Sequence, residues 1–180
     1  MKFGLFYELS VPRPWTRESE RTVYDNALEQ VKLADELGFD QVWAVEHHFL
    51  EEYSHCPAPE LFLTACAMVT KKIRVGFGIV VCVPEFNHPI KIAERTAVLD
   101  ILSGGRVDVG TGRSATWTEL AGFNAKPDIT KKSAGTSSCD ACRACGPRRS
   151  SSSRASSGRC RAGQSCPRST SARIRRCGWR

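Results

Sequence analysis

The chain of 180 residues carries 26 Lys and Arg, 19 Asp and Glu and nine Cys, but its charge is unevenly placed. Residues 1–133 hold 15 basic against 18 acidic residues, a net charge of −3, whereas residues 134–180 hold 11 Arg against one Asp, a net charge of +10. The overall charge of +7 therefore belongs to the last 47 residues, and it does not indicate a nucleic-acid-binding surface on the rest.

The start of the chain lacks the pattern of an export signal or a membrane span. The apolar run that begins at Phe3 is interrupted by Glu8, well short of the roughly 20 residues that a spanning helix needs. Cys56, Cys66 and Cys82 are scattered through apolar sequence, which is typical of buried, reduced thiols. We expect a cytoplasmic protein with no membrane partner.

The first elements alternate between strand and helix. Residues 2–8 form an apolar strand, and a helix follows from about Glu20 with Ser19 as the expected N-cap. Gly38 supplies the stop for this helix. Residues 41–46 then give a second short strand.

The same alternation continues along the chain. Pro59 opens a second helix, and residues 73–83 are almost wholly apolar, as in a strand that is covered on both faces. Pro89 fits the first turn of a third helix, which extends to about Leu102. Residues 106–110 form the fourth strand.

A fourth helix is predicted after the small loop 111–114. Thr116 and Glu119 have the spacing of a capping box, in which each side chain bonds the backbone N–H of the other residue. Four alternating strand–helix units predict parallel strands joined by right-handed crossovers. Both a doubly wound sheet and half of a TIM barrel fit this pattern, and no Gly-rich phosphate loop follows the first strand.

Several short motifs decide between these folds by resemblance. They are Met-Lys-Phe-Gly-Leu-Phe at 1–6, Gly-Phe-Asp-Gln-Val-Trp at 38–43, Val-Glu-His-His-Phe at 45–49, Asn-His-Pro at 87–89, the 99–106 turn and Val-Gly-Thr-Gly-Arg at 109–113. In this order and spacing the sequence resembles the bacterial luciferase-like family of flavin-dependent monooxygenases, from residue 1 to about Asn124. The resemblance implies an α/β fold of the TIM-barrel family, with the first four of eight units in residues 1–133.

The resemblance also implies site residues. His47 matches the active-site histidine placed near the reactive edge of the flavin, where an imidazole can donate or accept a proton near neutral pH. Arg113, together with free amide groups of the helix that follows, would hold the FMN phosphate, and Ala115 lies beside it. The alternatives are a structurally bonded histidine and a surface arginine, and a structural role is what we expect for His48.

Three further positions complete the implied cofactor site. Glu46 matches a position that touches the flavin through its backbone. Gly78 and Ile79 match a segment that in family members can hold a strained cis peptide beneath the flavin ring. Gly112 departs from the luciferases, which carry a reactive cysteine there, so light emission is not implied.

The implied reaction uses reduced FMN and O₂ to oxygenate a small organic substrate, with a separate flavin reductase as partner. A sister branch of the superfamily uses deazaflavin F420 for hydride transfer instead, and assembly into a homo-oligomer stays open. Three functions compete: a working flavin monooxygenase, an inactive truncated fragment of one, and a half-barrel whose basic arm binds nucleic acid.

Residues 134–180 do not continue the fold. They contain eleven Ser, eleven Arg and six Cys but no Leu, Val, Phe, Tyr or Met, which predicts disorder. Cys139, Cys142 and Cys145 begin an iron–sulfur spacing, but Arg149 stands where the fourth cysteine belongs, so no metal site is predicted. Aromatic residues that would stack on RNA bases are not interleaved, which makes nucleic acid an unfavoured partner.

Out-of-frame translation of a GC-rich gene explains this tail composition better. One back-translation of residues 134–143, read from its third base, gives Trp-Asp-Glu-Phe-Val-Arg-Arg-Leu-Pro, which looks like the family's continuation. We therefore hypothesise a frameshift near Ser133. Resequencing the locus tests this, because a single intact frame with no alternative continuation would contradict it.

Overall fold

The structure is a computed structural model that describes residues 1–114, 116–128 and 130. The predicted tail, with its expected disorder and its frameshift origin, lies outside the described residues, as does Ala115.

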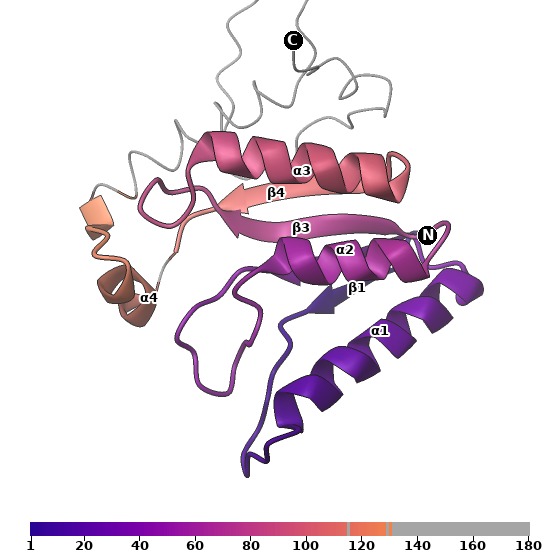
Figure 1. Ribbon diagram of the computed structural model, residues 1–180, viewed down its shortest axis with the longest axis horizontal. Coiled ribbons are helices and arrows are strands. Elements are labelled where there is room, and N and C mark those ends of the chain that lie inside the picture. Colours follow the sequence, from indigo (N-terminus) through magenta and orange to yellow (C-terminus); the bar gives the residue numbers. More distant parts are fainter. Residues whose placement is uncertain (115, 129, 131–180) are drawn as a thin grey trace, which may run out of the picture.

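Four parallel strands form one sheet in the order β1-β2-β3-β4, and a helix follows each strand (Figure 1). The elements are β1 (Gly4–Tyr7), α1 (Ser19–Leu37), β2 (Gln41–Val45), α2 (Pro59–Val69), β3 (Arg74–Val81), α3 (Pro89–Ser103), β4 (Val107–Gly112) and α4 (Trp117–Gly122). The four predicted strand–helix units are therefore all present.

Several of the predicted boundaries need correction. Strand β1 covers Gly4–Tyr7 rather than residues 2–8, and β3 covers Arg74–Val81 rather than residues 73–83. Glu18, not Ser19, is the N-cap of α1, and the Ser19 hydroxyl instead accepts a hydrogen bond from the N–H of Thr16 at 2.9 Å. Strand β4 extends two residues beyond the predicted end, because Thr111 and Gly112 continue to pair with β3. Gly38 ends α1 as predicted, with a left-handed φ of 82°.

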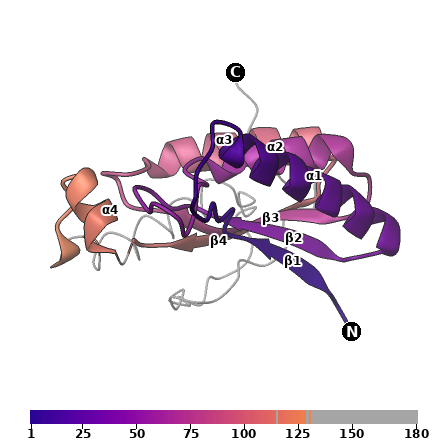
Figure 2. The same ribbon diagram turned by 90° about the horizontal axis from the view of Figure 1, so that it is seen from below.

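The core lies between one face of the sheet and helices α1, α2 and α3, which all cover that face (Figure 2). Each strand points alternate side chains toward these helices, as Val42 of β2 and Val75 of β3 do. Val31, Leu63 and Leu99 are the helix side chains that meet them, and each is at most 1% exposed. Burial of such a side chain contributes about 1.5–3 kcal/mol, so this one-sided core is the main source of stability.

The opposite face of the sheet has no such cover among the described residues. Phe6 is 60% exposed and Ile79 is 41% exposed, while Trp43 lies flat beside Gly76, where an added Cβ would stand 2.4 Å from the indole ring. Strands β1 and β4 each have one edge without a strand partner in the described part of the chain. An apolar face between two open edges is what half of a closed barrel leaves exposed.

Strand β3 is irregular in its middle. Ala44 pairs with Phe77 but Val45 pairs with Ile79, so Gly78 is an extra residue in the register. Gly110 of β4 passes close to this bulge, since a Cβ there would stand 2.5 Å from the carbonyl oxygen of Gly78. Bulges of this kind commonly occur beside active sites, where they redirect side chains.

A carboxylate and a guanidinium hold the turn that leads into β3. Asp35 accepts hydrogen bonds from the N–H groups of Lys71, Lys72 and Ile73 at 2.9, 2.8 and 2.6 Å. On the other side of the turn, Arg106 donates to the carbonyl oxygens of residues 67, 70 and 73. Burial acts to raise the pKa of Asp35, but the three N–H donors and the charge of Arg106 outweigh it, so the pKa is lowered.

We predict that Asp35→Ala lowers the free energy of unfolding by roughly 3 kcal/mol, because it leaves three backbone donors without an acceptor. Urea denaturation at pH 7 measures this, with the exposed Glu36→Ala as the matched control. Since folding lowers the pKa of Asp35, its contribution is full above the ordinary value of 3.8 and is lost as the pH falls through the folded-state value. Equal destabilisation by the two variants would contradict the role of the carboxylate.

Candidate active site

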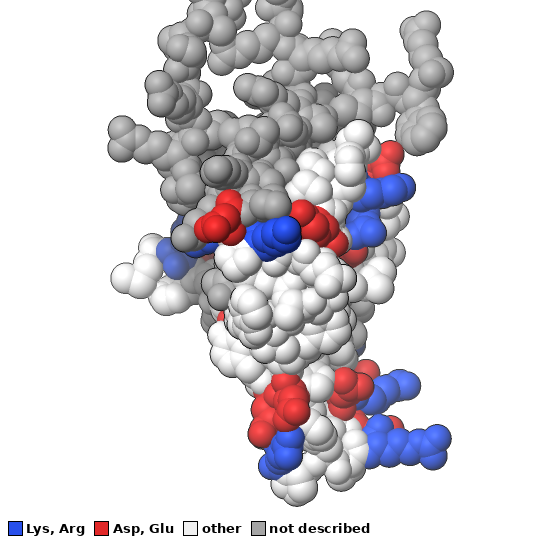
Figure 3. Space-filling model, turned by 90° about the vertical axis from the view of Figure 1, so that its left-hand side faces the viewer, with Lys and Arg blue, Asp and Glu red and all other residues white. Residues whose placement is uncertain are grey.

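The carboxyl ends of the four parallel strands lie at one end of the sheet. Glu8 follows β1, residues 46–48 follow β2 and Ser114 follows β4. Figure 3 views the molecule from this end and shows uncharged residues across its middle, with acidic and basic side chains around them. This is where catalytic residues gather in barrels of parallel strands.

His47 stands at this end with both ring nitrogens facing carboxylates. Its Nδ1 lies 2.9 Å from Oε1 of Glu119, and its Nε2 lies 3.6 Å from Oε2 of Glu8. The ring of Tyr53 meets the imidazole edge-on, with 5.5 Å between ring centroids. The side chain is 24% exposed, so His47 is fixed in orientation yet reachable.

Glu119 is the group that fixes this orientation. It is 1% exposed, and its Oε1 accepts from Nδ1 of His47 and from the N–H of His48, both at 2.9 Å. Its Oε2 accepts from the hydroxyls of Ser114 and Thr116 at 2.6 and 2.5 Å. Burial acts to raise the pKa of Glu119, but these hydrogen bonds outweigh it and hold the pKa below its ordinary value. An ionised carboxylate only accepts, so Nδ1 of His47 carries a proton.

The capping box predicted a different role for Glu119. Thr116 is the N-cap of α4, as expected, and accepts from the N–H of Glu119 at 3.4 Å. The Glu119 carboxylate, however, crosses to the end of β2 rather than returning to the backbone of Thr116. The sequence carries no signal for this, because the partner is 72 residues away along the chain.

Glu46 joins the ends of β2 and β3. It is 4% exposed, and its side chain accepts from the N–H of Val81, from Nδ2 of Asn87 and from Nε2 of His48, at 2.7, 2.7 and 2.9 Å. Its own N–H donates to the carbonyl oxygen of Ile79 at 3.0 Å. The carboxylate is thus occupied by structural contacts, and any contact of Glu46 with a ligand is left to its backbone.

His48 packs within a group of aromatic rings. Its ring centroid lies 4.8 Å from that of Phe123 and 5.9 Å from that of Phe86, and Phe86 in turn stacks on Phe123 at 4.1 Å. With Nε2 bonded to Glu46, the ring has a structural setting, which agrees with the role expected for it.

Gly78, Ile79 and Arg113 are also at this end, in different settings. Ile79 presents its side chain on the open face of the sheet beside Gly112, where an added Cβ would stand 2.9 Å from Cγ2 of Ile79. The peptide bond between Gly78 and Ile79 is trans. Arg113 is exposed and has no ion pair with any described residue. The helix that follows Arg113, α4, spans only six residues, and the anion contact expected of Arg113 stays a prediction.

The cysteines of the described region are buried. Burial raises the pKa of Cys66 and of Cys56 to about 12, and Cys82 is fully buried. A thiol with so high a pKa has almost no thiolate at neutral pH, so Cys66 and Cys56 are unreactive in the folded chain.

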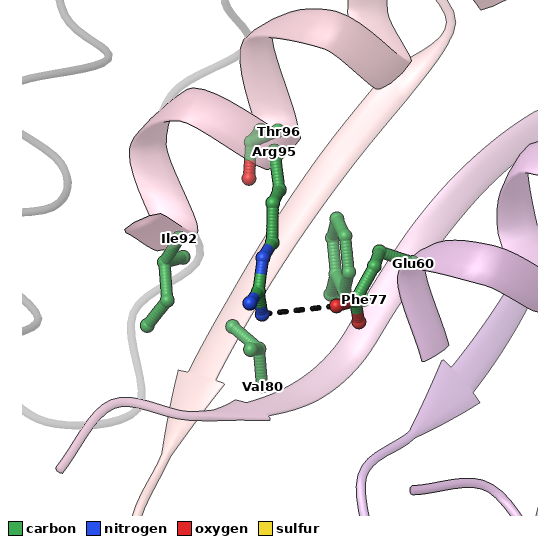
Figure 4. A pocket seen from close by; sticks show the side chains of 6 residues that line it. All are labelled: Glu60, Phe77, Val80, Ile92, Arg95 and Thr96. Atoms are coloured by element: carbon green, nitrogen blue, oxygen red, sulfur yellow. Dashed lines mark hydrogen bonds and ion pairs between the residues drawn. The ribbon is translucent and has the colours of Figure 1, made fainter. Parts of the chain in front are cut away.

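A small pocket on the helix-covered side of the sheet contains none of the predicted site residues. It lies between α2, α3 and β3, and among its lining residues Arg95 donates to Glu60 at 3.0 Å (Figure 4). In the described part of the chain, no group of three or more His, Cys, Asp or Glu is placed to hold a metal ion. No helix among the described residues is long and apolar enough to cross a membrane.

The sequence of the chain matches the model of a known protein family. The family model described as luciferase-like monooxygenase matches residues 1–135. The chain belongs to the luciferase-like monooxygenase family. Its four units are therefore the beginning of a TIM barrel, as the motifs predicted.

The relatives in this family are longer than the chain. The oxygenase component of flavin-dependent trigonelline monooxygenase from Acinetobacter baylyi is 36% identical over 115 residues, which are 64% of this chain and 31% of that protein. The monooxygenase RslO1 from Streptomyces bottropensis is 34% identical with a TM-score of 0.70, over 79% of this chain and 42% of that one. The chain thus spans about a third of the curated relatives that it matches.

Two more distant solved structures share the fold. The oxygenating constituent of 3,6-diketocamphane monooxygenase from Pseudomonas putida, in complex with FMN, is 23% identical with a TM-score of 0.64, over 74% of this chain and 37% of that one. An F420-dependent secondary alcohol dehydrogenase is 23% identical with a TM-score of 0.62, over 78% and 40%.

We predict that Glu119→Ala lowers the free energy of unfolding by about 3 kcal/mol, because the N–H of His48 and the hydroxyls of Ser114 and Thr116 lose a buried acceptor. Glu119→Gln should retain most of the stability, since its amide oxygen still accepts from His47 and His48 and the hydroxyls turn to accept from its NH₂. Urea denaturation compares the two, with the exposed Glu85→Ala as control. A Gln variant as unstable as the Ala variant would contradict this account.

Proposed function

We propose that this chain carries the amino-terminal part of a flavin-dependent monooxygenase site that uses reduced FMN and O₂ to oxygenate a small organic substrate. The observation that carries the proposal is the orientation of His47, whose Nδ1 is held by the buried Glu119 at the carboxyl ends of the strands. Among the relatives, the trigonelline monooxygenase is named as flavin-dependent, and the diketocamphane monooxygenase binds FMN.

The residues present fit a flat cofactor with an anionic tail. Glycines at 110 and 112 leave the surface beside Ile79 without side chains, and any Cβ there would collide with Gly78 or Ile79. A planar ring needs such a cleared surface. Arg113, with no ion pair among the described residues, is the cation available for the FMN phosphate, and Ala115 is the residue that we assign beside it.

His47 is the group that moves a proton in this proposal. Its ring is anchored through Nδ1, so proton exchange with a bound ligand takes place at Nε2. Glu46 holds the ends of β2 and β3 together, and Gly78 and Ile79, which form the bulge in β3, are the residues that would contact the flavin ring. The bound flavin supplies the oxygen chemistry, and a separate reductase supplies the reduced flavin.

An inactive fragment is the second candidate function. It is favoured by the two open sheet edges and by the exposure of Phe6 and Ile79, which a complete barrel would cover. Use of F420 in place of FMN is supported only by the F420-dependent secondary alcohol dehydrogenase, whose similarity to this chain is one of fold. FMN is therefore the cofactor that we propose.

We predict that the 180-residue chain binds FMN and that Arg113→Ala weakens FMN binding roughly tenfold without changing riboflavin binding, since riboflavin lacks the phosphate. Fluorescence titration with both ligands measures this, while light scattering follows the size of the protein. Arg17→Ala is the matched control, because Arg17 is exposed and has no ion pair among the described residues.

Three outcomes separate the candidates. Binding of FMN by a folded species supports the monooxygenase site. Aggregation, or a folded chain that binds neither FMN nor reduced FMN, supports the inactive fragment. Preferential binding of F420 over FMN would replace the proposed cofactor.

A further inference from the structure

Glu8 is an acidic residue of the site that the sequence motifs do not point to. It follows β1, and its Oε1 accepts a hydrogen bond from the hydroxyl of Tyr53 at 3.2 Å. Its Oε2 is buried and accepts no hydrogen bond from the described residues, yet it faces Nε2 of His47 at 3.6 Å. A buried carboxylate oxygen without a donor is costly.

Whether Oε2 of Glu8 has a donor depends on the protonation state of His47. If Nε2 has no proton, two acceptors face one another at 3.6 Å, and Oε2 of Glu8 stays unsatisfied. If Nε2 carries a proton, Oε2 gains a charged partner while Nδ1 donates to Glu119. We infer that Glu8 is a positioning residue which, together with Glu119, holds His47 as a doubly protonated imidazolium.

The backbone around Glu8 keeps the carboxylate in place. Leu9 follows it with φ of 54°, a left-handed value that branched side chains rarely adopt, and is 4% exposed. Its carbonyl oxygen accepts from the N–H of His55 at 3.0 Å, and the Ser10 hydroxyl donates to the carbonyl oxygen of Tyr53 at 2.6 Å. The segment after β1 and the loop after β2 therefore hold Glu8 and Tyr53 together.

The other titratable groups around the imidazole agree with this state. Glu119 faces it from α4 with a lowered pKa, and so remains a carboxylate. Tyr53 faces it from the loop after β2, and the charge of Glu8 together with their hydrogen bond raises the pKa of Tyr53. The Tyr53 hydroxyl thus keeps its proton and remains a donor to Glu8.

This assignment makes His47 a proton donor and deepens the proposed function, on which it rests for the place of His47 in the site. The proton leaves Nε2 for a basic oxygen or nitrogen of the bound ligand, and the ring becomes neutral while Nδ1–H stays bonded to Glu119. The ligand's new O–H or N–H then lies beside Oε2 of Glu8 and can replace the lost partner.

Nitrogen-15 NMR of the histidine-labelled, flavin-free 180-residue chain at pH 7.5 tests the inference. We expect the signals of two protonated nitrogens for His47, assigned with a His47→Gln sample. Glu8→Gln should lower the ratio of charged to neutral ring at least tenfold, because it removes an opposite charge at ion-pair distance. Glu8→Asp keeps the charge in a shorter side chain and should retain more of the charged ring than Glu8→Gln.

Glu85→Gln, an exposed carboxylate in the loop after β3, is the control and should leave the ratio unchanged. A neutral ring with a bare Nε2 in the unmodified chain overturns the inference, as does an equal ratio in the Gln and Asp variants of Glu8. Because flavin is absent throughout, failure of FMN binding in the earlier titration and failure of this test are independent results.

Discussion

One buried carboxylate determines the geometry at the carboxyl ends of the strands. Glu119 receives the imidazole and backbone of the segment after β2 on one oxygen and the hydroxyls of the segment after β4 on the other. Strands β2 and β4 are not neighbours, so no ladder hydrogen bond joins them. The carboxylate therefore closes a ring of contacts across β3, and the orientation of His47 follows from it. Glu46 makes the shorter link, between β2 and β3.

Much of the fold follows from local pattern. The alternation of apolar strands with helices, punctuated by Gly38, Pro59 and Pro89, is a property of neighbouring residues, and the structure has all four units. The boundaries that differ depend on partners elsewhere. Strand β4 reaches Gly112 because β3 offers two more pairing residues, which no local pattern in 106–112 reveals. The bulge at Gly78 likewise depends on three strands meeting.

The residues of the candidate site likewise fall into those that local motifs predict and those that depend on distant contacts. His47, Glu46 and Arg113 were predicted because the motifs around them resemble a family, and the structure puts them at the same end of the sheet. Glu119 and Glu8 were missed because their roles come from contacts 72 and 39 residues away. The spacing of Thr116 and Glu119 even predicted a local partner for the carboxylate. A buried acid that satisfies a distant histidine leaves no trace in a single sequence.

The uncovered face of the sheet has a consequence for the synthesis of longer members of the family. The amino-terminal strands leave the ribosome first, and their inner face waits in water until later strands arrive. Here the helix-covered side is already packed, and the waiting face is apolar mainly at Phe6, Trp43 and Ile79. Glycines at 76, 110 and 112 supply no side chain to that face. The two open strand edges and these apolar side chains are therefore available to a neighbouring nascent chain until the later strands cover them.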